Sequence, residues 1–312
     1  RRPATGVIAT GDIAEILALD ADVVIHCARL APPYGSHDAE ILQLLASGKN
    51  VISINGFSHP GHWGGARLEA LEAACRAGGS TLMAAGLNPR FAAEQLAVVA
   101  TGVCSELDHV EIVESVDCRA IRSPDYAFGV LGFGSVPASF DPNDPDWGPA
   151  ASLNGMYAEV LAAMAVRLGL DLERIETDHQ TFSATEDLAV SAGPIGKGKV
   201  SHLSWRWHGI VAGRRMLTMS IHWYMEAAHL AEPEPPLWRI HVRGHPGVRL
   251  SVDLEKRADD RTATSAEQLG VAGAVINAIP IVVAAPPGVM TRPVATPYRG
   301  GHAALASAPS LV

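Results

Sequence analysis

The first third of the chain alternates helix-like segments with short apolar runs, and this alternation constrains the fold more than any other feature. Each run ends at small or polar residues; the three runs are Val23–Cys27, Val51–Ile54 and Thr81–Ala85. Such alternation is typical of a parallel sheet whose strands are joined by crossover helices. The sequence therefore predicts an α/β fold, in which ligands bind outside the carboxyl ends of the strands.

The glycine-rich turn that usually accompanies such a sheet is not found before the first run. No G-x-G-x-x-G follows a strand there, and residues 1–6 (RRPATG) look like loop. In dinucleotide-binding domains this turn holds the pyrophosphate at a helix N-terminus. We therefore expect a Rossmann-like parallel sheet from which the first βαβ unit is missing.

The composition is that of a soluble globular protein and excludes one class of partner. Hydrophobic residues make up 48% and charged residues 18% of the 312 residues, enough chain for two domains. The formal net charge is −9. Because phosphate binding needs clustered Lys and Arg, no nucleic-acid partner is expected.

The cysteines indicate a reducing compartment. The four are widely spaced, none forms a C-x-x-C pair, and they are Cys27, Cys75, Cys104 and Cys118. No signal peptide opens the chain, so we expect reduced core residues rather than disulfides. A cytoplasmic location follows as an expectation.

One apolar run, Leu269–Val289, resembles a membrane span in length. A bilayer-spanning helix needs about 20 apolar residues. The run contains Asn277 and Pro280, and Ser265 and Glu267 before it look like a helix start. These features favour a buried helix of a soluble protein, and no membrane partner is expected.

The pattern changes after residue 93. Leu107–Ile121 alternates like a strand, a loop rich in Gly and Pro follows, and residues 152–168 form a helix. Further strand-like stretches lie near residues 175–184, 200–211, 215–224 and 238–254, with a hairpin turn at 211–215. Residues 94–262 are therefore predicted to form a central α+β domain with a mainly antiparallel sheet. Residues 1–93, completed by 263–312, form the nucleotide-binding domain.

Small and polar residues at the three strand ends are the first candidate site. We expect the following to bind the cofactor: Cys27, Ala28, Arg29, Asn55, Gly56, Gly86, Asn88 and Pro89. Such residues let a dinucleotide approach the backbone, and Asn88 can both donate and accept hydrogen bonds. Ordinary turn chemistry explains the same residues, and Asn88 with Pro89 also fits a helix N-cap and first position.

Two histidines follow the second strand. His59 and His62 have an H-x-x-H spacing, but Pro60 and Gly61 make a helix there unfavourable, and no Cys or carboxylate lies nearby. No metal site is therefore predicted. The two side chains are candidate proton donors at the mouth of the cleft, and exposed structural histidines are the alternative.

Aromatic and polar residues of the central domain are candidate substrate contacts. His222 and Tyr224 share one face of a strand and Trp223 takes the other. Tyr126 and Phe133, in the glycine-rich loop, are placed to close over a substrate. Aromatic sheet packing, a subunit interface or packing of the loop itself would explain the same residues.

Four strings of the sequence resemble a known family: DADVVIHCAR, GKNVIS, AAGLNPRF and INAIPIVVAAPPGV. They are similar to the dihydrodipicolinate reductase-like group, which includes 2,4-diaminopentanoate dehydrogenases and native amine dehydrogenases. The resemblance covers residues from about Thr10 to Val289. It implies NAD(P)H bound to a Rossmann domain, a central domain folded over it, a returning C-terminal helix and dimers through the central sheet. It also implies reduction of small imines or reductive amination of ketones.

The chain departs from the family pattern in three places. The glycine-rich unit is missing, and the glutamate of the amine dehydrogenases is replaced by a stretch without carboxylate, residues 55–59 (NGFSH). The family's NPGF becomes Asn88-Pro89-Arg90-Phe91, which puts a cation where glycine is usual. These departures bear on cofactor binding and on amine chemistry.

Together these features predict an NAD(P)H-dependent reductase or dehydrogenase for a small C=N or C=O substrate. The cofactor is NADP or NAD, with NADP slightly preferred, and the chain is expected to be a homodimer. His59 or His62 would supply the proton while Asn88 orients the substrate or the carboxamide. A catalytically silent ligand-binding relative, or a fragment of such an enzyme, is the alternative.

Overall fold

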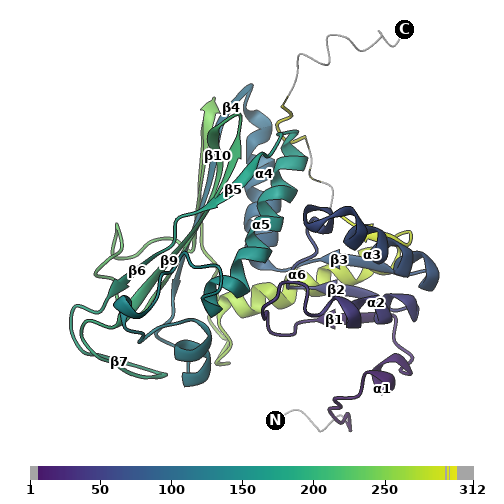
Figure 1. Cartoon of the computed structure of the whole chain (residues 1–312), viewed down its shortest axis with the longest axis horizontal. Coiled ribbons are helices and arrows are strands. Elements are labelled where there is room, and N and C mark those ends of the chain that lie inside the picture. Colours follow the sequence, from purple (N-terminus) through teal and green to yellow (C-terminus); the bar gives the residue numbers. More distant parts are fainter. Residues whose placement is uncertain (1–5, 292–293, 295, 301–312) are drawn as a thin grey trace.

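Two large sheets with a long helix between them form most of the described part of the protein, and a two-stranded sheet adds to them (Figure 1). The computed structural model describes residues 6–291, 294 and 296–300. One of the large sheets is parallel and has four strands, and the other has seven. The predicted fold class, a parallel α/β sheet with a separate, mainly antiparallel sheet, is confirmed.

The strands of the parallel sheet lie where the apolar runs predict them. They are β1 (Val23–His26), β2 (Asn50–Ser53), β3 (Thr81–Ala84) and the returning β13 (Gly288–Met290). The helices of this part are α1 (Ile13–Leu17), α2 (Asp38–Ala46), the short η1 (Pro60–Trp63), α3 (Gly65–Gly78) and α6 (Ala266–Val283). The strands lie in the order β1-β2-β3-β13 and all run parallel, so their carboxyl ends meet at one edge of the sheet.

Helices cover both faces of this sheet. Alternation along the strands puts Val51 and Leu82 on the face packed by α2 and α3, and Ile52 and Met83 on the face packed by α6. Burial on both faces explains why the strands read as continuous apolar runs rather than as alternating ones.

Helix α6 is less buried than the sequence predicts. Its buried residues are Val275, Ala278 and Val282, which face the sheet, while Leu269 and Ile276 are 42% and 60% exposed. By length and composition alone it is apolar enough to cross a membrane, with a mean hydropathy of 1.6, and 17% of its residues are buried. The expectation of a buried helix is therefore wrong in degree, because only one stripe of the helix packs.

A connection of unusual helices leads from the parallel sheet to the central one. It consists of the π-helical η2 (Leu87–Ala97), α4 (Val98–Ala100) and η3 (Thr101–Val103). The central sheet then contains β4 (Glu106–Asp117), β5 (Arg174–Thr177), β6 (Gln180–Ser183), β9 (Val200–Val211), β10 (Arg214–Tyr224), β11 (Trp238–His245) and β12 (Val248–Val252). Its strand order is β12-β11-β4-β10-β9-β5, and β6 also pairs with β9. Further short elements are η4 (Asp125–Val130), η5 (Pro137–Ser139), β7 (Leu188–Val190) and β8 (Gly193–Ile195).

Two predicted strands are each divided in two. The stretch near residues 175–184 is interrupted at Asp178 and His179, and the stretch 238–254 turns at residues 246–247. The predicted hairpin at 211–215 joins β9 and β10, which are antiparallel, whereas β10 pairs with β4 in parallel. The domain limits at residues 93 and 262 remain predictions. Residues 1–5, 292–293, 295 and 301–312 of those domains lie outside the described residues.

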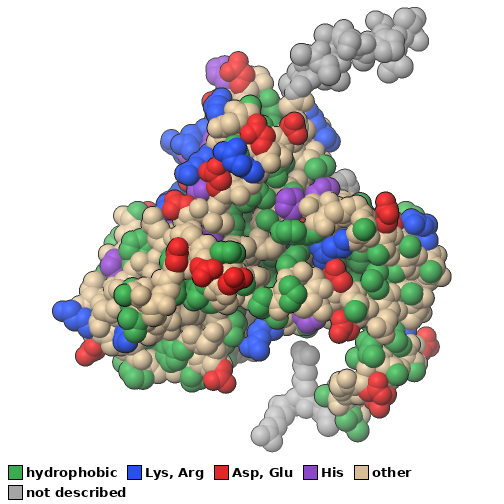
Figure 2. All heavy atoms as spheres, viewed as in Figure 1, with side chains coloured by type: hydrophobic (Ala, Val, Ile, Leu, Met, Phe, Trp, Pro, Cys, Tyr) green, Lys and Arg blue, Asp and Glu red, His purple; other side chains and the backbone are tan. Residues whose placement is uncertain are grey.

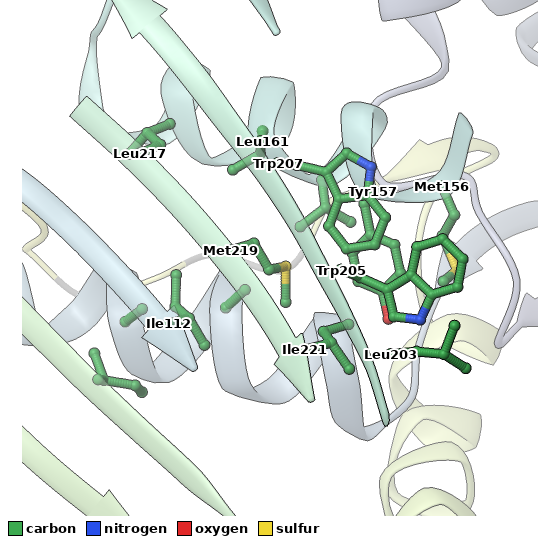
Figure 3. Packing of buried hydrophobic residues seen from close by; sticks show 14 of the residues in the cluster. Ile112, Met156, Tyr157, Leu161, Leu203, Trp205, Trp207, Leu217, Met219 and Ile221 are labelled. Atoms are coloured by element: carbon green, nitrogen blue, oxygen red, sulfur yellow. The ribbon is translucent and has the colours of Figure 1, made fainter. Parts of the chain in front are cut away.

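Helix α5 (Gly148–Leu168) fills the space between the two sheets (Figure 1). It begins four residues before the predicted start, with Pro149 in its first turn, where the missing N–H is no loss. Its Tyr157 stacks on Trp207 of β9 with ring centroids 4.2 Å apart, and Trp205 lies next to them (Figure 3). This packing fixes the distance between α5 and the central sheet.

Candidate active site

The carboxyl ends of β1 and β2 open into a cavity of about 400 Å³, which we name the apolar chamber. The strand ends contribute Cys27, Ala28, Arg29, Ile54 and Asn55. The opposite wall comes from η4, α5 and β10 and includes Tyr126, Leu153, Met156, Tyr157 and Trp223. The chamber thus lies where ligands bind in parallel α/β sheets, between the parallel sheet and the central sheet.

Asn55 connects the two strand ends of this chamber. Its side-chain amide donates to the backbone carbonyl of Ala28, and its backbone N–H donates to Ser53 Oγ over 3.1 Å. Gly56, the next residue, has φ +85°, and a Cβ there would collide with the ring of Tyr34. Only glycine fits that position, so the turn is fixed by packing.

Five of the residues predicted to bind the cofactor line either the apolar chamber or a second cavity that adjoins it. Cys27, Ala28, Arg29 and Asn55 line the apolar chamber, and Asn88 lines the adjoining one. Gly56, Gly86 and Pro89 line neither cavity. Cys27 is exposed, so the expectation that it belongs to the core is wrong, whereas the other three cysteines are buried and all four are free.

The second cavity, of about 590 Å³, lies at the carboxyl ends of β3 and β4, and we name it the acidic chamber. Its charged lining consists of Glu114, Asp117, Arg122 and Glu267. Apolar residues beside these include Leu87, Val116 and Val271. Tyr126 lines both chambers, which therefore adjoin.

Glu114 is the functional candidate that the sequence reasoning missed. It takes the same face of β4 as Val110 and Ile112, which belong to the core, and it is 8% exposed. Trp238 Nε1–H donates to Glu114 Oε1 over 2.8 Å. Burial raises the pKa of Glu114, while the Trp238 and Asn88 side chains oppose that shift. A charged residue in the apolar register of a strand was the available signal.

Asn88 has the backbone of a helix N-cap but not the side-chain bond of one. Its φ and ψ are −123° and 127°, outside the helical region, as predicted. Yet neither atom of its side-chain amide has a hydrogen-bond partner of normal geometry among the described residues, and both atoms are buried. The amide lies close enough to Glu114 to lower the pKa of that carboxyl.

The structure places the predicted proton donors outside both chambers. The backbone N–H of His59 donates to Glu159 Oε1 over 2.8 Å. His62 lines a separate cavity of about 490 Å³ with Trp63, Asn154 and Trp207. Burial there lowers the pKa of His62.

The predicted substrate contacts are divided between different surroundings. Tyr126 lines both chambers, whereas Phe133 is 1% exposed and belongs to the core. Strand alternation places Trp223 toward the apolar chamber, with His222 and Tyr224 on the opposite face. His222 lines a cavity of about 550 Å³ there, and its Nδ1 lies 3.1 Å from His202 Nε2.

Arg90, the cation in the NPRF string, points away from both chambers. It is 3% exposed, its Nη1 lies 3.1 Å from Glu94 Oε1, and its Nη2 donates to the carbonyl of Gly56 over 2.7 Å. Glu94 also pairs with Arg167 at 2.7 Å and accepts a hydrogen bond from Ser58. The arginine is thus part of a buried network under the strand ends.

Among the residues that the structure describes, no group of three or more His, Cys, Asp or Glu is arranged to hold a metal ion. The candidate site consists of the apolar chamber, the acidic chamber and the residues that line them.

Comparisons with known proteins agree with this architecture. No protein-family model matches the chain. A curated amine dehydrogenase from Streptomyces virginiae is 23% identical over 296 residues, which is 91% of this chain and 79% of that protein. A solved amine dehydrogenase from Mycobacterium smegmatis superposes with a TM-score of 0.71 at 19% identity, over 92% of this chain and 79% of that one.

The fold is that of the Rossmann-type dehydrogenases, and the chain is an oxidoreductase. More particularly, it is a homologue of an amine dehydrogenase. The prediction that the protein is an oxidoreductase is therefore confirmed.

Proposed function

We propose that the protein is an NAD(P)H-dependent reductase or dehydrogenase of the dihydrodipicolinate reductase-like or amine dehydrogenase-like kind, acting on a small C=N or C=O group. The observation that carries the proposal is the apolar chamber, bounded on one side by the ends of β1 and β2 and on the other by Tyr126 and Trp223. Its position between two domains and its few polar groups are typical of a small-molecule site.

The residues at the strand ends fit the nicotinamide end of such a cofactor. The chamber walls are mostly apolar. Asn88 lines the adjoining acidic chamber, and its amide offers a donor and an acceptor of the kind a carboxamide needs. When bound, the cofactor supplies the hydride. We propose NADP or NAD, with a slight preference for NADP.

The chain's own residues then have three tasks. Leu153, Met156 and Trp223 exclude water from the chamber. Asn55, held by the Ala28 carbonyl, keeps the two strand ends in register. Tyr126 lines both chambers, and its hydroxyl, which stays protonated and whose pKa is raised by partial burial, would donate the proton to the substrate. His59 and His62 remain predicted donors.

Fluorescence titration with NADPH and NADH, followed by turnover assays with aldehydes, ketones and cyclic imines with and without ammonium, tests the proposal. We expect saturable binding of at least one cofactor and oxidation of it with one substrate class. The variant Trp223→Ala should weaken turnover at least tenfold, and Arg174→Ala, on the exposed surface of β5, should not. A folded protein that binds neither cofactor would instead be the catalytically silent relative.

We further propose a cytoplasmic homodimer formed through the open face of the central sheet. Support comes from charges of both signs on that face, where Arg214, Arg215 and Arg243 lie near Asp108 and Glu111, because such a surface can meet its own copy. Figure 2 shows basic, acidic and histidine side chains together over the ends of β4 and β10. Sedimentation of the wild type and of Arg214→Glu tests this, and a monomeric wild type would contradict it.

A further inference from the structure

We propose that the apolar chamber takes an apolar ketone or aldehyde, whose carbonyl oxygen is held by the hydroxyls of Tyr126 and Tyr157, and that the product is an alcohol rather than an amine. The inference rests on the proposed function and narrows its two reacting groups, C=N and C=O, to the carbonyl. Three features of the chamber support it: the charges of its lining, the Tyr157 hydroxyl and the Tyr126 hydroxyl.

The described lining of the apolar chamber carries no negative charge. It contains no aspartate or glutamate, and its one charged side chain is the exposed Arg29, which has no ion-pair partner among the described residues. The carboxylates of the candidate site line the acidic chamber instead, and they are Glu114, Asp117 and Glu267. A protonated imine carries a positive charge, which a mostly apolar cavity with a cation in its wall opposes. A carbonyl group is neutral and incurs no such cost.

Tyr157 provides a hydroxyl whose position is fixed. The residue is 3% exposed, and its ring stacks on Trp207 with centroids 4.2 Å apart (Figure 3). It lines the apolar chamber, so the part that stays accessible faces that chamber, and its hydroxyl has no hydrogen-bond partner in the described part of the chain. Burial, and after it the negative charge of Glu114, raise the pKa of Tyr157 well above its usual value, so the hydroxyl keeps its proton. Because polar groups in protein interiors are normally paired, this O–H lacks an acceptor that a ligand would provide.

Tyr126 adds a second hydroxyl to the same chamber. This hydroxyl also forms no hydrogen bond with the residues that the structure describes, and Tyr126 lies close enough to Tyr157 to raise the pKa of that residue. A carbonyl oxygen has two lone pairs and can accept from both hydroxyls. Both donors then stabilise the negative charge that this oxygen gains as a hydride is added to the carbon. An iminium nitrogen has no free lone pair and accepts from neither hydroxyl.

The reduction is balanced with the reduced cofactor and water as co-reactants. The hydride that the cofactor supplies forms a C–H bond at the carbonyl carbon, and the electron pair of the C=O π bond moves to the oxygen. That oxygen takes the proton of the Tyr126 hydroxyl while Tyr157 continues to donate to it, and Tyr126 regains a proton from water. The carbonyl group is thereby reduced to an alcohol, and the cofactor is oxidised.

Binding can be tested without the cofactor by three compounds that share a cyclohexane ring. Cyclohexanone offers an acceptor oxygen, methylenecyclohexane has a methylene group in its place, and cyclohexylammonium chloride offers a cation with N–H groups. Saturation-transfer NMR at constant ionic strength measures the Kd of each compound. We expect cyclohexanone to bind roughly tenfold more tightly than the other two, because it alone accepts from the two hydroxyls.

The variant Tyr157→Phe keeps the stacked ring and removes only the hydroxyl. We expect it to raise the Kd of cyclohexanone roughly fivefold and to leave that of methylenecyclohexane within about twofold, a difference that a purely structural change would not produce. Tyr224→Phe, the same change on the opposite face of β10, should alter neither Kd. Should Tyr157→Phe fail to fold, Tyr126→Phe, at a residue that is 41% exposed, should show the same selective loss.

Product analysis tests the chemistry of the loaded enzyme. With NADPH or NADH we expect cyclohexanone to give cyclohexanol, measured by gas chromatography, and added ammonium chloride to give no cyclohexylamine. Tyr157→Phe should lower kcat/KM for the ketone roughly tenfold, because the developing negative charge loses one donor, and Tyr224→Phe should not.

The proposal is overturned if cyclohexanone does not saturate the protein, if either of the other compounds binds as tightly, or if the folded Phe variants keep the wild-type Kd. Cyclohexylamine as the product would also overturn it. Cofactor titration separates these outcomes from the proposed function. Binding of NADPH or NADH without selectivity for the ketone removes only the carbonyl site. Selectivity for the ketone without binding of either cofactor removes the proposed function and leaves the carbonyl site.

Discussion

Glu159, in the middle of α5, accepts a hydrogen bond from the backbone N–H of His59 over 2.8 Å. The same carboxylate, which is fully buried, accepts the O–H of Tyr34 over 2.5 Å and lies 3.4 Å from Arg67 Nη1. Arg67 in turn pairs with Asp38 at 2.6 Å. One side chain of α5 therefore holds the loops that follow β1 and β2, which also form one wall of the apolar chamber.

Removing this carboxylate should loosen the attachment of α5 to the parallel sheet. Glu159→Ala leaves the His59 N–H and the Tyr34 hydroxyl unpaired in a buried place, and we expect the free energy of unfolding to fall by about 3 kcal/mol. Urea unfolding followed by circular dichroism measures it. Asp259→Asn, an exposed residue, should give no measurable change. A loss for Glu159→Ala below about 1 kcal/mol would show that the network contributes little.

Restoring glycine in the NPRF string should affect stability and not cofactor binding. In Arg90→Gly, the Gly56 carbonyl loses its donor and Glu94 keeps only Arg167 as a cationic partner, so we expect a loss of roughly 2–4 kcal/mol. The NADPH Kd should stay within twofold, because the guanidinium lies outside both chambers. A tighter Kd in the variant would mean that Arg90 does obstruct the cofactor.

Replacing Tyr126 distinguishes its hydroxyl from His59 and His62 as the proton donor. If its hydroxyl provides the proton, Tyr126→Phe should lower kcat roughly a hundredfold, as expected for loss of a general acid. The NADPH Kd should not change, because the ring remains. Stopped-flow oxidation of NADPH with the preferred substrate gives kcat directly. A kcat within twofold of wild type would return the role to His59 or His62.

The sequence predicts those features that depend on neighbours along the chain. Apolar runs identify β1, β2 and β3 because both faces of this sheet are buried, and alternation places Trp223 opposite His222. Alternation does not predict which face of β10 lines the apolar chamber. In the structure it is the face that carries Trp223. The sequence does not predict the role of Glu114 for a similar reason, because its hydrogen-bond partner Trp238 is 124 residues away along the chain.

The buried side chain of His179 makes the stability of the core depend on pH. It is 2% exposed, its Nδ1 accepts the backbone N–H of Arg206 over 3.1 Å, and its Nε2 lies 2.9 Å from Asn154 Oδ1. In the neutral imidazole with its proton on Nε2, both ring nitrogens are therefore hydrogen-bonded: Nδ1 accepts from Arg206, and Nε2–H donates to Asn154. Protonation would place a hydrogen on Nδ1 against an N–H group, and it is opposed first by burial and also by the nearby Arg206 and His208, so the pKa of His179 is lowered to about 4.

Because the unfolded chain binds this proton near pH 6.5 and the folded chain only near pH 4, the neutral imidazole stabilises the fold fully above pH 6.5. That contribution, about 3 kcal/mol, should be lost progressively as the pH falls from 6.5 to 4. His179→Asn retains an acceptor near the Nδ1 position but does not titrate, so its free energy of unfolding should fall less steeply over this range. His109 and His202, whose pKa values are also lowered to about 4, contribute equally to both proteins and cancel in the difference. Urea unfolding of both proteins at pH 7, 6 and 5 measures the two slopes. Equal slopes would show that His179 is not protonated on unfolding in this range.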